Sequence, residues 1–118
     1  MNNRDRLDGM AERIRESFEA KSAARDAAIN QSRALIGHCA NAIRAVHRHE
    51  WDVAQARLET ARQAAEEMRA QVADYPDLYH SGYTQDALKE FAEACITYAL
   101  VHGDDLPEPG ALHVEDAT

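Results

Sequence analysis

Apolar residues recur every three or four positions along most of the chain, which is the spacing of amphipathic helices. In the first 46 residues they fall within one arc of about 100° when each residue is rotated by 100° on a helical wheel. This apolar stripe consists of Leu7, Met10, Ile14, Phe18, Leu35, Ile36, Cys39, Ile43 and Val46. The pattern predicts one long helix, over about residues 3 to 48, with the stripe buried. Small residues replace the stripe in "AKSAARDAAINQS", which predicts a kink or a close helix approach there.

A second helix is expected after a break in the pattern near residue 50. Asp52 is its candidate N-cap, and the helix is expected to run to about Asp74 and to be ended by Pro76. Its apolar positions again recur at helical spacing and comprise Leu58, Ala61, Ala65, Met68 and Val72.

The third predicted helix follows "YPDLYHSGY", which is interpreted as a connection. Ser81 or Thr84 is the candidate cap, and the helix is expected to end near His102, with Gly103 directly after it. Three helices with short connections predict an all-α antiparallel helical bundle whose first helix is long.

Length and composition indicate the number of domains and the cellular location that we expect for the protein. The chain has 118 residues, of which 45% are hydrophobic, a size and composition typical of one domain over residues 1–118. It contains no run of roughly 20 apolar residues, and its first residues lack a signal-peptide pattern. We therefore expect a cytoplasmic protein without a membrane partner. Cys39 and Cys95 form no Cys-x-x-Cys pair and are expected to be reduced, partly buried thiols.

Charge is distributed unevenly around the net value of −8. Residues 1–50 contain nine Lys/Arg and seven Asp/Glu, whereas residues 51–118 contain four Lys/Arg and fourteen Asp/Glu. A nucleic-acid contact is therefore expected in the first half of the chain and a cation site in the second half.

The stretch "DALKEFAEACITYAL" combines apolar residues with three acids. On a helical wheel Asp86, Glu90 and Glu93 share a face that we expect to lie opposite the core residues Leu88 and Phe91. Carboxylates gathered in this way are typical ligands of Mg²⁺ or Mn²⁺, but an acidic, solvated helix face is more common. Spacing alone leaves both interpretations open.

Two groups of residues are candidates for contacts with nucleic acid. The long helix carries a row of arginines, Arg4, Arg15, Arg33, Arg44 and Arg48, and His47 lies near its end. Guanidinium groups suit phosphate oxygens, although salt bridges on a solvated face are the more common reason for such a row. Tyr79, His80 and Tyr83 in the connection can stack on bases, but such residues more often close a helix junction.

Several stretches taken together resemble the translin superfamily, and within it the archaeal Trax-like proteins. They are "NQSRALIGHCANAIRAVHRHEWDVAQARLETARQAAEEM", "YPDLYHSGYTQDALKEFAEACITYAL" and "DDLPEPGALHVEDA", and they cover nearly the whole chain from about Ala24 onward. The most specific piece is "SGYTQDALKEFAEA", which is similar to the family helix in which Trax-type subunits carry Glu-aromatic-x-Glu. The matching residues here are Glu90, Phe91, Ala92 and Glu93.

This resemblance implies a function and an assembly. Glu90 and Glu93 would be catalytic residues that bind Mg²⁺ or Mn²⁺ in an endoribonuclease, with Asp86 as a weaker third ligand. An octamer-like homo-oligomer, or an assembly with a second translin-family subunit, would enclose single-stranded or short duplex RNA, or single-stranded DNA. Family members continue with further helices that contribute another acidic ligand, and we expect this chain to lack those C-terminal helices.

Three hypotheses follow from the sequence. The first is a metal-dependent endoribonuclease subunit that acts through Glu90 and Glu93. The second is a noncatalytic subunit that binds RNA or single-stranded DNA through Arg44, His47 and Arg48 together with the aromatic connection. The third is a helical oligomerisation or interaction module without activity.

Overall fold

The computed structural model describes residues 2–103. Its first element is α1, Asn3–His47, a continuous helix of 45 residues. The Asn2 side chain caps its N-terminus by accepting a hydrogen bond of 2.8 Å from the Asp5 amide. The prediction of one long helix over residues 3 to 48 is confirmed.

Three further helices complete the described chain, namely α2, Trp51–Gln71, α3, Pro76–Tyr79, and α4, Gly82–His102. The all-α class and the order of the long helices are as predicted, and Gly103 follows α4 with a φ of 92°, as expected for a glycine at a helix C-terminus. Two sequence interpretations were wrong. Asp52 lies inside the first turn of α2, and Glu50 occupies the cap position. α2 ends at Gln71, before it reaches Asp74, so Pro76 does not end this helix but begins the short helix α3.

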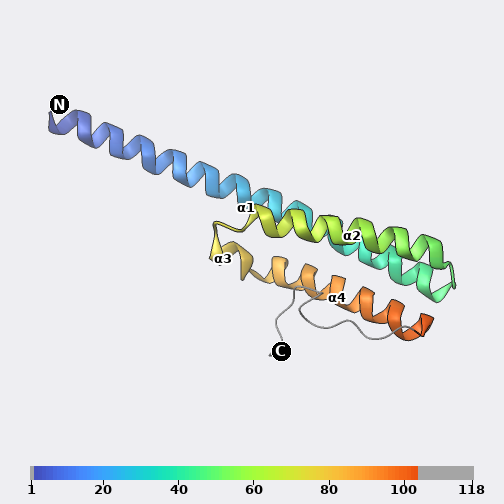
Figure 1. Ribbon diagram of the computed structural model, residues 1–118. Coiled ribbons are helices and arrows are strands. Elements are labelled where there is room, and N and C mark those ends of the chain that lie inside the picture. Colours follow the sequence, from blue (N-terminus) through green and yellow to red (C-terminus); the bar gives the residue numbers. More distant parts are fainter. Residues whose placement is uncertain (1, 104–118) are drawn as a thin grey trace.

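α2 and α4 pack side by side against the C-terminal half of α1 (Figure 1). α2 runs back along α1 after a tight turn, and α4 covers both helices. The central core is formed by residues of all three helices: Leu35 and Cys39 of α1, Ala61, Ala65 and Met68 of α2, and Ala87, Leu88, Phe91 and Ala94 of α4. Two smaller clusters lie at the ends of the bundle, one beside α3 and one beside the α1–α2 turn.

Small residues of α1 form the contact with the α2–α3 connection. Ala24 and Ala28 are buried there against Val72 and Leu78. Ser32, one turn further on, is also buried and donates a hydrogen bond of 2.7 Å to the Ile29 carbonyl. The predicted close approach within "AKSAARDAAINQS" is therefore confirmed.

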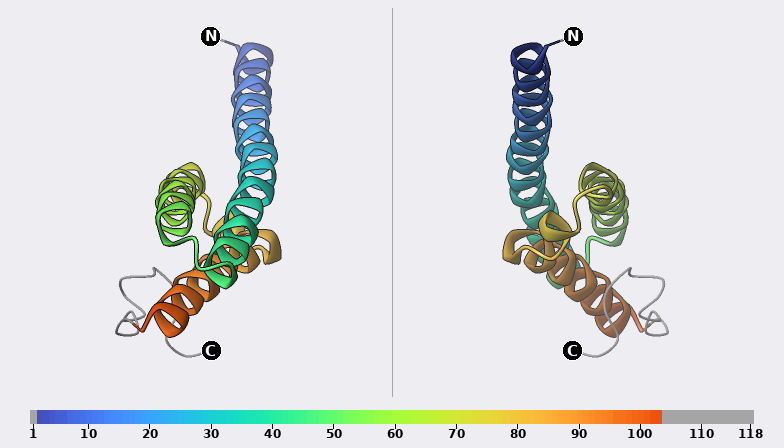
Figure 2. Two further views of the ribbon diagram at one scale, coloured as in Figure 1. Left: turned by 90° about the vertical axis from the view of Figure 1, so that its right-hand side faces the viewer. Right: turned by 90° about the vertical axis from the view of Figure 1, so that its left-hand side faces the viewer.

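The N-terminal half of α1 projects beyond the rest of the bundle, as both views of Figure 2 show. At a rise of about 1.5 Å per residue the 45 residues of α1 span about 67 Å, close to the longest molecular dimension of 70 Å. The stripe residues Leu7, Met10, Ile14 and Phe18 are 64%, 49%, 67% and 72% exposed. The prediction that these four residues are buried was wrong, because α2 and α4 reach only the second half of α1. It was also wrong for Ile36, which is 38% exposed because it lies at the edge of the stripe.

No helix in the described range 2–103 has the length and apolar character needed to cross a membrane.

Candidate nucleic-acid interface and the acids of α4

The turn between α1 and α2 holds exposed basic side chains in a defined backbone conformation. The Glu50 amide donates to the Ala45 carbonyl at 2.9 Å, and the His49 amide donates to the Val46 carbonyl at 3.0 Å. This pair of bonds is the Schellman arrangement, which places one residue in the left-handed region. That residue is His49, with a φ of 58°, where glycine is the usual choice. The turn therefore presents an imidazole at a position that normally carries no side chain.

We call the exposed residues Arg44, His47, Arg48 and His49, together with the half-buried Trp51, the basic turn. The Arg44 guanidinium donates to the Asn41 side-chain oxygen at 2.9 Å, and Arg48 lies 3.9 Å from the Glu50 carboxylate. The latter pair is solvent-exposed and long, so it holds Arg48 only weakly. Both guanidinium groups are therefore accessible to an anionic ligand.

Aromatic rings support the basic turn from α2 and α4. Trp51 stacks against His49 with ring centroids 5.0 Å apart and meets Tyr98 and His102 of α4 edge-on at 6.0 and 4.7 Å. The Tyr98 hydroxyl accepts a hydrogen bond of 2.8 Å from the Gln55 side-chain amide. These contacts fix the Trp51 ring beside His49. Trp51 and Tyr98 were not among the residues predicted from the sequence, although an aromatic residue next to "RAVHRHE" was a usable signal.

The aromatic connection predicted to contact nucleic acid lies at the other end of the bundle. Tyr79 and Tyr83 are half-buried and pack, together with Tyr75, against the cluster formed by Ala24, Ala28, Val72 and Leu78. His80 is exposed and meets Tyr79 edge-on at 4.9 Å. The side chains of Thr84 and Gln85 donate to the Leu78 and Tyr79 carbonyls at 2.8 and 2.7 Å, which fixes α3 to the start of α4. These aromatic residues close a helix junction, which is the more common of the two roles considered for them.

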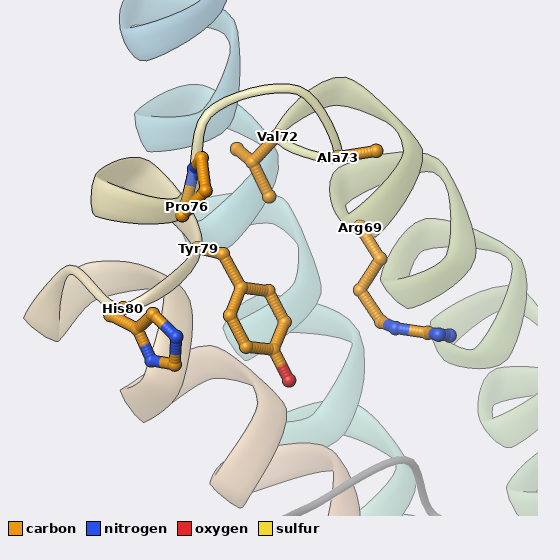
Figure 3. Close-up of a pocket in the computed structure, with 6 residues that line it drawn as sticks. All are labelled: Arg69, Val72, Ala73, Pro76, Tyr79 and His80. Atoms are coloured by element: carbon orange, nitrogen blue, oxygen red, sulfur yellow. The ribbon is translucent and has the colours of Figure 1, made fainter.

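A hollow of about 390 Å³ lies beside this junction. Figure 3 shows the Tyr79 ring projecting between His80 and Arg69, with Val72, Ala73 and Pro76 above it. Along α1 the junction lies at Ala28 and the basic turn lies at Ala45. The two positions are 17 residues apart along α1, which corresponds to about 25 Å of helix. The predicted nucleic-acid residues therefore form two separate groups, and one short ligand does not contact both.

The three acids of α4 do not have equal surroundings. Asp86 and Glu93 are exposed, as expected for a solvated face. Glu90 is half-buried, and its carboxylate is one of the groups that raise the pKa of Cys39 on α1. The expectation that all three lie opposite the core was wrong for Glu90, because the buried face of α4 also includes Ala87 and Ala94 and is wider than Leu88 and Phe91 suggest.

A metal site at these acids would need further ligands beside them. Within residues 2–103 no group of three or more His, Cys, Asp or Glu side chains is arranged to hold a metal ion. Hard divalent ions take about six oxygen ligands, of which a protein site supplies several. The described residues alone therefore hold fewer grouped ligands than the Mg²⁺ or Mn²⁺ centre that the resemblance implies would need.

Cys39 and Cys95 are free thiols, as predicted. Cys95 is partly buried against the central core, as expected, whereas Cys39 is fully buried in it. Burial, assisted by Cys95 and Glu90, raises the pKa of Cys39 to about 12.

Since the thiolate is the reactive form, Cys39 should resist alkylation near pH 8 in the folded protein. We expect iodoacetamide labelling followed by peptide mass spectrometry to modify Cys39 only after urea unfolding. Equal labelling of Cys39 in folded and unfolded protein would contradict its burial.

Comparisons of the chain with protein-family models, with curated proteins and with solved structures find no match.

Proposed function

We propose that this protein is a nucleic-acid-binding subunit of the translin type, which binds RNA or single-stranded DNA through the basic turn. The observation that carries the proposal is the stacking of His49 on the fixed ring of Trp51, within a short segment that also carries the exposed side chains of Arg44, His47 and Arg48. Guanidinium groups bind phosphate oxygens, and aromatic or imidazole rings stack on unpaired bases. The basic turn offers both kinds of contact within one short segment.

The charge distribution is compatible with this location. The chain is acidic overall, and its first half holds nine of the thirteen Lys/Arg. Glu50 and Asp52 lie next to the basic turn, so the local charge is nearly balanced. A phosphate can replace Glu50 as the partner of Arg48, because that ion pair is exposed and 3.9 Å long. We therefore expect binding that is modest and strongly weakened by salt.

Fluorescence anisotropy with a labelled single-stranded RNA, in a salt series from about 50 mM upward, tests the proposal. We expect the double substitution Arg44→Ala with Arg48→Ala to lower the association constant about tenfold at the lowest salt. Two lost phosphate contacts should also reduce the salt slope by about 1.4, or 0.7 for each contact with a single strand. The matched control is Arg25→Ala, an exposed arginine of the same helix that does not belong to the arginine row.

A second variant separates stacking from charge. His49→Gly removes the imidazole while keeping the turn, because glycine readily adopts a positive φ. It should lower affinity without changing the salt slope, since base stacking contributes about 1–3 kcal/mol and involves no counterion release. No binding by the wild type at low salt, or an equal loss in Arg25→Ala, would exclude the basic turn as the interface.

Endoribonuclease activity is the second candidate function, favoured by the match of Glu90, Phe91 and Glu93 to the Glu-aromatic-x-Glu pattern. The two glutamates are neighbours on α4, and further ligands would have to come from another copy or from residues outside the described range. Mn²⁺-dependent cleavage of the same RNA that is lost in both Glu90→Ala and Glu93→Ala would establish the nuclease. Binding without cleavage would leave the noncatalytic function.

A further inference from the structure

We propose that the projecting half of α1 packs along the outer face of α4 in a second copy of this chain. The contact is heterologous, because a helix of one copy meets a different surface of the other copy. It involves neither the basic turn nor nucleic acid, and so goes beyond the function proposed above.

The exposed end of the stripe continues a surface that is already an interface. Further along the same side of α1, Leu35, Cys39 and Val46 are buried against α2 and α4. Toward the N-terminus the stripe continues through Leu7, Met10, Ile14 and Phe18, where no helix of the described chain covers it. All residues from 10 to 23 are exposed. Because packing supplies most of the stability of helices in proteins, a helix with such an apolar side calls for a partner.

The charges beside the stripe indicate the chemistry of that partner. On a helical wheel Arg6 and Arg13 lie along one edge of the exposed stripe, and Arg4 and Arg15 lie along the other. The acids of this segment lie mainly on its opposite side: Asp5, Asp8, Glu12, Glu16 and Glu19. Two such stripes packed on each other would place arginines against arginines along both edges. The fitting surface is therefore one that is apolar and acidic.

The outer face of α4 has these properties. Lys89, Glu93, Ile96 and Leu100 follow one another at spacings of four, three and four residues, which forms one row along the helix. Ile96 is 37% exposed and Leu100 is 65% exposed. Asp86 and Glu93 supply exposed carboxylates beside them, and only Lys89 opposes this charge.

The two surfaces also match in length. Residues 3–20 of α1, which end before the Lys21–Asp77 ion pair, span about 27 Å, and the 21 residues of α4 span about 31 Å. The projecting helix can therefore lie along most of α4 as an additional helix of the partner's bundle. Each copy then offers one helix and one face, so repetition of the contact generates a closed ring or an open filament.

Light scattering coupled to size-exclusion chromatography tests the proposal on the full chain. We expect the wild type to exceed the 13.1 kDa of one chain and to grow with concentration. Ile14→Asp and Leu100→Asn should each raise the dissociation constant by about tenfold or more, because each introduces a polar group into one side of the contact. The matched controls are Glu16→Ser, on the opposite side of the projecting helix, and Val101→Asn, the neighbour of Leu100 on a different side of α4.

Mixing the two variants is the decisive experiment. Ile14→Asp retains an intact α4 face, and Leu100→Asn retains an intact projecting helix. An equimolar mixture should therefore form a complex of twice the mass of one chain, although each variant alone is monomeric under the same conditions. Circular dichroism melting of each variant checks that the bundle is folded, since neither substitution lies in the core.

Several outcomes would overturn the proposal. A wild type that stays monomeric at all concentrations excludes self-assembly. If Leu100→Asn assembles as strongly as the wild type, the outer face of α4 is excluded as the docking face. Assembly that strengthens with salt indicates stripe-on-stripe packing, because salt screens the repulsion between arginines, whereas the proposed contact weakens with salt. A mixture that stays monomeric, or a monomer that binds anionic lipid vesicles, also excludes the proposed partner.

Discussion

Phe91→Ala should lower the free energy of unfolding by about 3–5 kcal/mol. Phe91 is the largest of the fully buried side chains and lies where α1, α2 and α4 meet. Its neighbours include the small residues Ala61, Ala65 and Ala94, which cannot extend into the space that a lost ring would leave. Since small domains have a total stability of about 5–15 kcal/mol, the loss is a large part of the whole.

Urea unfolding followed by far-ultraviolet circular dichroism measures this change. Phe91→Leu is the control, because it keeps most of the apolar volume and should cost much less. Arg62→Ala is a second control. The Arg62 guanidinium lies 5.9 Å from the Phe91 ring centroid, and its removal should cost about 0.5–1 kcal/mol. A loss below 1 kcal/mol in Phe91→Ala would mean that the ring does not join the three helices.

The position of Phe91 also bears on the two glutamates. Phe91 lies directly after Glu90 and two residues before Glu93, so the burial of its ring sets the rotation of α4 about its own axis. That rotation leaves Glu93 exposed and Glu90 half-buried beside α1. A variant that loosens the ring therefore changes the directions of both carboxylates, and loss of any activity in Phe91→Ala is not evidence that the ring takes part in it.

Helix positions were predictable from the sequence because they depend on local patterns. The continuous α1, the end of α4 at Gly103 and the close approach at Ala24 and Ala28 all followed from periodicity, glycine preference and residue size. The start of α2 was misplaced, because Asp52 is a good N-cap by type, whereas the Schellman turn at His49 and Glu50 decides where the chain re-enters a helix. Cap preference is a weak signal beside backbone geometry.

Burial along α1 was not predictable from periodicity alone. The apolar residues of the stripe recur at helical spacing both before and after the small residues of "AKSAARDAAINQS", but only the second half of the stripe meets α2 and α4 within the described chain. Periodicity identifies the side of a helix that is suited to packing, and helix lengths determine how much of it is covered. α2 and α4 have 21 residues each against 45 in α1, so more than half of α1 extends past either of them.

The candidate site was predictable in part for a similar reason. Arg44, His47 and Arg48 are close in sequence and therefore close in space, whereas Tyr79 and His80 depend on where the chain returns along α1. The antiparallel return of α2 carries them to the far end of the bundle. Tyr98 joins Trp51 only because α4 ends beside the α1–α2 turn, a contact that no sequence spacing indicates.

Ala28→Leu should lower the free energy of unfolding by about 1–3 kcal/mol, because the added carbons have no space. Ala28 is fully buried where α1 meets Val72 and Leu78, and this contact holds α3 against α1. The exposed ion pair between Lys21 and Asp77, with a nitrogen-to-oxygen distance of 2.6 Å, lies near the same contact and is too weak to hold α3 alone.

Urea unfolding measures the loss of stability in Ala28→Leu. Ala20→Leu, an exposed position on the same helix, adds the same volume and should change stability by less than about 0.5 kcal/mol. Equal tolerance of leucine at both positions would contradict the close approach of α3 to α1, and with it the junction that places Tyr79 and His80 away from the basic turn.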